Sequence, residues 1–351
     1  MAEADRRSQA TGQAWLWTTA ALTTCSLVTV VALAPPAGAT PVRALSWLLF
    51  TGSSVHVAST GWLFTLPPVR DYARQHKLRC VWIPVCLIGV TAVAAAAISP
   101  AVFQWLLLPY FSWQFYHYQK QNIGMAALAA ASGQIRPLSR SERNSLVLAG
   151  VATIGALAGD PRLLGLRIRL DIPWLRLAAL AVFAVAVVAG LLALATRSPA
   201  AKPAGFTAVY LISLLFGLPA FVFASPYAAV GGMTVAHGLQ YLLLISLIAS
   251  QTVVPGAGRA RSPRLSRLAV LANIALIGGV LLSTASHLHN SGQAGRLIFG
   301  AYLGVVMAHF VIDAGIWRMR DPLARKFVTE SVPFLTPTPA VNPRSAVTDR
   351  S

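Results

Sequence analysis

Long apolar stretches alternate with short polar connections along nearly the whole chain, a pattern typical of proteins that cross a membrane many times. Prolines bound several of the stretches, and proline interrupts a helix. The stretches cover approximately residues 14–34, 44–66, 80–98, 101–132, 143–159, 172–196, 204–224, 227–254, 266–286 and 294–318. The sequence therefore predicts an all-α, polytopic integral membrane helix bundle of about ten transmembrane helices.

The connections contain no repeat of fixed period and no low-complexity linker that would divide the chain. We therefore expect a single transmembrane domain over residues 1–326. Residues 327–351 are rich in Pro, Thr and Ser and are predicted to form a disordered cytoplasmic tail. The first apolar stretch resembles a signal peptide in outline, but its length of about 21 residues exceeds the usual apolar region of a signal. It is interpreted as an uncleaved first helix.

Most basic residues fall in connections that a ten-helix topology places on one side of the membrane. Since cytoplasmic loops are enriched in Lys and Arg, both termini are predicted to be cytoplasmic. The bias towards Ala, Arg and Val suggests a bacterial protein, and hence the bacterial cytoplasmic membrane. The connection over residues 160–176 disagrees, because it carries four arginines on the predicted outer side. It is either an amphipathic surface segment or a sign that the fifth helix is misassigned.

Composition agrees with the membrane interpretation. Of 351 residues, 56% are hydrophobic and only 11% are charged, and the mean hydropathy is +0.64. The net charge of +18 comes from short basic connections, and no basic helix or aromatic-basic platform is present. We therefore expect the lipid bilayer, and no nucleic acid, as the partner of this chain.

A polar cluster interrupts the fourth apolar stretch. At 3.6 residues per turn, Trp113, His117 and Gln121 lie on one helix face, with Lys120 beside it. A polar group in hydrocarbon costs free energy unless it has a partner. The cluster therefore predicts that other helices contribute polar side chains facing it.

Four of the seven histidines lie inside apolar stretches: His56, His117, His237 and His309. In the predicted topology their four helices run in the same direction, and the histidines lie roughly 15 to 26 Å from the helix starts. They can therefore share one layer of the membrane. Asp313 lies one turn after His309 and is the one acidic residue predicted inside a membrane helix.

Neutral imidazoles and a carboxylate suit Fe(II), Zn or Mn, and two histidines with one carboxylate form the oxygen-activating set of non-haem iron enzymes. The predicted metal ligands are His117, His237, His309 and Asp313. His56 is predicted to be a fourth ligand or a catalytic base, and Lys120 an electrostatic partner of Asp313. The residues predicted to orient the ligands beside the cofactor are Gln121, Gln240 and Tyr241.

The same residues fit other functions. Two histidines can clamp a haem, although the sequence has no CxxCH motif, and the site can take another transition metal. Asp313, Lys120 and the histidines can instead form the pathway of a proton- or ion-coupled transporter. If the polar groups only satisfy one another, the protein is a non-catalytic membrane scaffold.

Three short motifs resemble segments of poorly characterised bacterial polytopic membrane proteins. They are His309-x-x-x-Asp313, His237-x-x-Gln240-Tyr241 and Trp113-x-x-x-His117-x-x-x-Gln121. The placement of histidines within helices is similar in outline to the bacterial carotene-cleaving membrane oxygenases. It is less similar to the membrane fatty-acid desaturases, whose HxxxH and HxxHH boxes this sequence lacks. The resemblance is architectural, so it implies a shared polar site and no particular substrate.

Together these observations predict a membrane metalloenzyme, a non-haem iron oxidoreductase or oxygenase. Its substrate is expected to be a lipophilic small molecule that enters between helices from the lipid. The metal would bind O2, and a separate electron donor is an expected partner.

Overall fold

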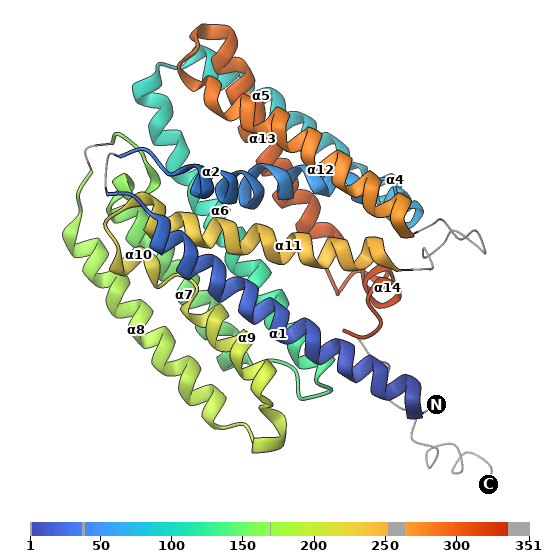
Figure 1. Cartoon of the computed structure of the whole chain (residues 1–351). Helices are drawn as coiled ribbons and strands as arrows, with labels where there is room; N and C mark the ends of the chain where they lie inside the picture. The colour runs from blue at the N-terminus through green and yellow to red at the C-terminus, as the bar shows by residue number, and fades with distance from the viewer. Residues whose placement is uncertain (1, 37–38, 169, 252–263, 336–351) are drawn as a thin grey trace.

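The computed structural model describes residues 2–36, 39–168, 170–251 and 264–335, with side chains from residue 10 onward. Every regular element in these ranges is a helix, so the all-α prediction is confirmed for the described residues (Figure 1). The arrangement follows from the apolar composition, because helices satisfy all of their own backbone hydrogen bonds when they lie in hydrocarbon.

Each of the ten predicted stretches is mainly helical over its described residues. The main helices are α1 (Ala2–Leu33), α2 (Arg43–Phe50) with η1 (Thr51–Val55) and α3 (His56–Leu63), η2 (Leu78–Trp82) with α5 (Ile83–Ala97), α6 (Pro100–Ser132), α7 (Arg140–Gly159), α8 (Pro173–Ala195), α9 (Ala204–Leu215) with α10 (Pro219–Val222), η5 (Tyr227–Gly231) with α11 (Gly232–Ser250), α12 (Arg264–Ser286) and α13 (Gly292–Ile316). The shorter elements are α4 (Pro67–Gln75), η3 (Pro161–Leu164), η4 (Pro199–Ala201), η6 (His287–Asn290) and α14 (Pro322–Ser331).

Among the described residues, six helices are long and apolar enough to cross a membrane by themselves: Ala10–Leu33, Leu78–Ala97, Pro173–Ala195, Tyr227–Ser250, Arg264–Asn290 and Gly292–Ile316. The protein is therefore a multi-pass membrane protein. The other predicted stretches include α2, α3 and α9, which are short, and α6, which carries the polar cluster. Some of the stretches are also interrupted by a π-helical turn, such as η1 directly before His56.

The site lies where α3, α6, α11 and α13 meet, in the interior of the bundle. Figure 1 shows α11 crossing the middle of the molecule, with α1 along one side of it. The pairs that pack most closely are α13 with α5, α7 with α8, α1 with α11, and α3 with α12. Helix α11 is the most enclosed of the six spans, because other helices cover it on several sides.

A contact between two glycines brings two of these helices together. Gly52 in η1 faces Gly238 in α11, and a methyl group on Gly238 would lie 2.7 Å from the Cα atom of Gly52. Glycine is therefore required for this close approach, since no larger side chain fits. His56 follows Gly52 by one helical turn and His237 precedes Gly238, so the contact sets the distance between the two histidines.

The prediction of a disordered tail from residue 327 is wrong over residues 327–335. Helix α14 extends to Ser331, and Phe327, Val328 and Leu335 are buried. Asp321 caps the helix by accepting hydrogen bonds from the backbone of the first turn, and the apolar face packs against the bundle. The packed helices therefore extend beyond residue 326, where the transmembrane domain was predicted to end. Residues 336–351 of the predicted tail lie outside the described residues.

The arginine-rich connection after α7 is a folded surface segment. Asp160 forms ion pairs with Arg162 at 2.7 Å and with Arg176 at 3.4 Å, and Leu163 is buried. Helix α7 covers the whole predicted fifth helix, but it is not among the six described helices that are long and apolar enough to cross a membrane by themselves. Part of the positive charge in this connection is balanced locally by Asp160.

Candidate metal centre

Four imidazole rings from four helices converge in the interior. His56 at the start of α3 lies 5.0 Å from His237 of α11 and 5.1 Å from His309 of α13, measured between ring centres. His117 of α6 lies 5.0 Å from His237 and 5.2 Å from His309. All four side chains are buried. The structure thus brings together the four histidines that the sequence placed at similar depth.

Each of these rings has at least one nitrogen without a hydrogen-bond partner. The Nε2 atoms of His56, His117, His237 and His309 are all buried without a hydrogen bond, and so are the Nδ1 atoms of His56 and His237. Leaving one buried polar atom unsatisfied costs about 1–3 kcal/mol, so four such atoms at one place require an explanation. A lone pair on each Nε2 could instead be donated to a metal ion.

The rings lie close enough together for metal ligation. The four edges of this set of imidazoles measure 5.0 to 5.2 Å between ring centres. Candidate ligand atoms come within 4.8 Å of one another in two groups of three, so a single ion held by all four histidines requires the side chains to adjust. Neighbouring rings are inclined at 73° to 90°, so their edges do not clash.

Asp313 borders the same space. Candidate ligand atoms lie within 4.8 Å of one another in two overlapping groups, His56 with His237 and His309, and His117 with His309 and Asp313. The Oδ2 atom of Asp313 is 3.7 Å from Nε2 of His309. Its other oxygen, Oδ1, accepts a hydrogen bond of 2.9 Å from Tyr241. One carboxylate oxygen therefore remains available to the candidate metal centre.

A chain of hydrogen bonds fixes which nitrogen of His309 carries its proton. Tyr241 donates its hydroxyl proton to Asp313, so its oxygen accepts from Thr60 at 2.8 Å. Thr60 has then used its only proton and must accept from Nδ1 of His309, 2.7 Å away. His309 consequently carries its proton on Nδ1 and presents a lone pair at Nε2. Partners of this kind orient the histidine ligands of metal sites.

The two predicted glutamines do not contact the imidazoles. Nε2 of Gln121 donates to the backbone carbonyl of His237 and to Oε1 of Gln240, both at 2.9 Å. Gln240 donates in turn to Thr23 of α1 at 2.8 Å. These amides therefore join α6, α11 and α1 to one another, and the prediction that they orient ligand rings is wrong. Of the three predicted orienting residues, only Tyr241 is linked to an imidazole of the site by hydrogen bonds between described side chains, through Thr60 to His309.

Lys120 is not a partner of Asp313. Its side chain is exposed, and its ammonium group lies over the ring of Tyr116 at 5.9 Å. Tyr116 precedes Lys120 by one helical turn on the outer side of α6, whereas His117 points inward. The prediction of an ion pair with Asp313, and with it a role for Lys120 in the site, is wrong.

Aromatic rings that sequence reasoning missed hold the imidazoles in place. Tyr118 stacks on His237 with ring centres 4.1 Å apart, and Phe310 stacks on His117 at 4.5 Å. Trp113 in turn packs against Phe310 at 5.8 Å. Each of the two stacking residues directly follows a histidine in the sequence. Being next to a predicted ligand was the one weak indication of their role. The ring contacts limit the rotation of the two histidines.

No protein-family model, no curated protein and no solved structure matches this chain. The chemistry of the site therefore has to be argued from its own geometry. Buried imidazole nitrogens without hydrogen-bond partners, a carboxylate at their edge and an aromatic surround form a donor set suited to a transition metal.

Proposed function

We propose that this protein is a membrane-embedded, metal-dependent oxidoreductase or oxygenase that acts on a lipophilic substrate. The observation that carries the proposal is the convergence of four buried imidazole rings whose Nε2 atoms have no hydrogen-bond partner. An ordinary packing role would leave these atoms paired, because unsatisfied polar groups inside a membrane protein are costly.

The donor set favours iron. Imidazole suits Fe, Zn, Cu and Ni, and a carboxylate beside histidines is the arrangement of non-haem Fe(II) oxygenases. In this proposal His56, His117, His237 and His309 hold the ion, and Oδ2 of Asp313 completes the set. Bound iron would supply one-electron and O2 chemistry. The equal spacing of the four rings makes His56 a ligand in this proposal rather than a base.

The other side chains of the site orient these ligands. Thr60 and Tyr241 keep the proton of His309 on Nδ1, and Tyr118 and Phe310 restrict the rings of His237 and His117. The side chains around the site are mainly apolar and aromatic, and a surround of low polarity strengthens the electrostatic interactions within the site.

The proposal includes the topology that the sequence predicts. The chain would cross a bacterial cytoplasmic membrane about ten times, with both termini in the cytoplasm. A lipophilic substrate would then reach the site from the bilayer, and an electron donor would deliver electrons from outside the protein. The apolar, lipid-suited outer faces of α5, α8 and α12 support a location within the bilayer.

The rival function is a proton- or ion-coupled transporter. It would use Asp313 and the histidines, but the pathway loses Lys120, which lies on the outer surface of α6. A transporter does not consume O2, and this difference separates the two functions.

The test measures O2 consumption by the iron-loaded protein in lipid nanodiscs that contain host membrane lipids and a chemical reductant. Mass spectrometry after exposure to ¹⁸O2 would identify any oxidised lipid. We expect O2 uptake that His117→Ala abolishes and His287→Ala, at an exposed surface histidine, preserves. Fully iron-loaded wild-type protein that consumes no more O2 than His117→Ala would contradict the proposed function.

A further inference from the structure

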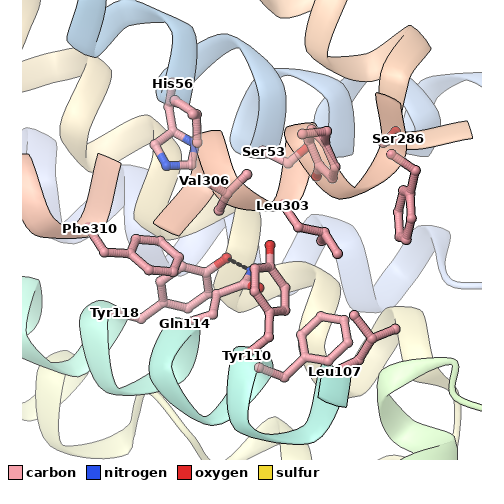
Figure 2. Close-up of a pocket in the computed structure, with 14 residues that line it drawn as sticks. Ser53, His56, Leu107, Tyr110, Gln114, Tyr118, Ser286, Leu303, Val306 and Phe310 are labelled. Atoms are coloured by element: carbon pink, nitrogen blue, oxygen red, sulfur yellow. Dashed lines mark hydrogen bonds between the residues drawn. The ribbon is translucent and has the colours of Figure 1, made fainter. Parts of the chain in front are cut away.

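A cavity of about 240 Å³ extends from His56 between η1, α3, α6 and α13 (Figure 2). At one end its wall consists of buried side chains, including His56, Tyr118 and Phe310. Towards the other end it is lined by Leu107 and Ser286, which are partly exposed. The cavity therefore runs from the surface region of the bundle to the edge of the candidate metal centre.

The wall is mainly apolar and aromatic, with a small number of polar groups. This is the general character of sites that bind small lipophilic molecules. At roughly 30 Å³ for each water-sized group, the cavity has room for roughly eight such groups. A whole membrane lipid is too large for this volume, whereas one medium-length aliphatic chain fits.

Gln114 offers the cavity a hydrogen-bond acceptor. Thr234 donates its proton to the carbonyl of Val230, so it accepts the bond that Tyr118 donates at 3.3 Å. Tyr118 must therefore accept from Gln114, which places the NH2 group of that amide towards Tyr118. Figure 2 shows this Gln114–Tyr118 bond at the wall of the cavity.

The carbonyl oxygen of the same amide remains without a hydrogen-bond donor. Oε1 of Gln114 is buried and has no hydrogen-bond partner. The hydroxyls of Tyr110 and Tyr302 line the same cavity, and within the described residues neither forms a hydrogen bond. An acceptor without a donor, next to two phenols that can donate or accept, matches a ligand hydroxyl, which does both.

We infer that this cavity binds the substrate of the proposed enzyme, and that the substrate is an aliphatic alcohol or the hydroxyl-bearing end of a longer lipid. Calling this ligand a substrate rests on the proposed function, but the binding of the alcohol itself requires no metal. The hydroxyl donates to Oε1 of Gln114, close to His56 and Phe310, and the apolar chain extends towards Leu107 and the rim.

The experiment uses a matched pair of probes, 8-bromo-1-octanol and 1-bromooctane, added to the full-length protein in nanodiscs. Bromine quenches tryptophan fluorescence at short range, and Trp113 packs against Phe310 in the cavity wall. Quenching through a site saturates, whereas quenching by probe dissolved in the bilayer rises steadily with concentration. Subtracting the signal of Trp113→Phe isolates the reporter next to the cavity.

We expect saturable quenching by the bromo-alcohol at roughly tenfold lower concentration than by bromooctane, since one hydrogen bond contributes about 1–1.5 kcal/mol. Gln114→Leu should remove this preference, and Val306→Phe should abolish the saturable component by filling the cavity. Val185→Phe, on the exposed face of α8, is the matched control and should behave as wild type.

Equal binding of the two probes by wild type, or an alcohol preference that survives in Gln114→Leu, would overturn the inference. The measurement is repeated on metal-free protein to separate it from the proposed function. Selective alcohol binding without metal supports the cavity assignment even if the enzyme proposal fails. Conversely, O2 consumption in protein that shows no alcohol preference would overturn this inference and leave the proposed function standing.

Discussion

At the scale of single residues, the distinguishing feature of the site is that several of its buried polar atoms have no hydrogen-bond partner. The four Nε2 atoms have no partner, while the opposite side of His309 is held by the hydroxyl of Thr60. Thr60, Tyr241 and Asp313 form a continuous chain of hydrogen bonds, so each position depends on its neighbours. Such a chain sets the orientation of a ligand before any metal binds.

Tyr241→Phe should weaken metal binding roughly 10- to 100-fold without removing a ligand, because it interrupts this chain and releases His309. It should also lower the free energy of unfolding by about 1–3 kcal/mol, since Thr60 and Asp313 lose a buried partner. Competition with a chelator measures the affinity, and thermal unfolding measures the stability. Tyr116→Phe, at an exposed tyrosine of α6, is the control. An unchanged affinity in Tyr241→Phe would show that the chain does not orient the ligand.

Lys120→Met should leave the metal affinity of the protein unchanged. The Lys120 ammonium lies over Tyr116 on the exposed side of α6 and forms no ion pair with the described residues. The same chelator competition measures the effect. A drop of more than about tenfold would mean that Lys120 acts on the site after all and would revive the ion pair with Asp313.

At the scale of helices, a close contact between two glycines sets the distance between two histidines of the site. Gly52 and Gly238 allow η1 and α11 to touch, and His56 and His237 lie beside that contact. A buried ion pair also links helices: Glu142, at the start of α7, pairs with Arg197 at 2.5 Å. Arg197 also donates to the carbonyls of residues 136, 137 and 201, so it joins the connections at the ends of α6, α7 and α8.

Gly238→Ala should therefore separate η1 from α11 and weaken metal binding at least about tenfold. The added methyl group would lie 2.7 Å from the Cα atom of Gly52, and overpacking of this kind costs about 1–3 kcal/mol. Gly89→Ala in α5 is the matched control, because a methyl group there meets no atom within 4 Å. Both variants gain the same helix propensity, so equal metal affinities in the two would contradict the proposed role of the contact.

The helices could be predicted from the sequence because hydropathy and proline positions are local signals. All ten apolar stretches are mainly helical over their described residues, and equal depth in four of them selected the four histidines that the structure brings together, His56, His117, His237 and His309. Rotation about each helix axis is not a local signal. For that reason Lys120 was placed on the wrong side of α6, and the stacking role of Tyr118 was missed. The amphipathic α14 was also missed, because its Pro- and Thr-rich surroundings resemble a disordered tail.

At the scale of the whole molecule, the protein is a membrane helix bundle with apolar outer faces. Its interior is more polar and contains the buried candidate site. The described spans expose many aliphatic side chains, such as Val185 and Leu281, while histidine, carboxylate and amide groups lie inside. This is the distribution expected in lipid, where polar groups face the interior of a bundle. A lipophilic substrate could thus reach the site without crossing water.

The proposed orientation in the membrane can be tested with reporter fusions. A green fluorescent protein joined after residue 351 should fluoresce, and alkaline phosphatase at the same point should be inactive, because the C-terminus is proposed to be cytoplasmic. Fusions after Asn290, at the end of η6, should show the opposite pair of activities. Active phosphatase at the C-terminus would reverse the orientation, and the same result at both points would remove α13 as a span.

The central claim is that four histidines from four helices hold one metal ion, and metal content per chain tests it most directly. Purified wild type, His56→Ala, His117→Ala and the exposed-site control His287→Ala would be loaded with Fe(II) and analysed by mass spectrometry of the elements. We predict about one ion per chain in wild type and His287→Ala, and a large loss in the other two. Folded wild-type protein without stoichiometric metal, or variants of His56 and His117 that retain it, would contradict the account.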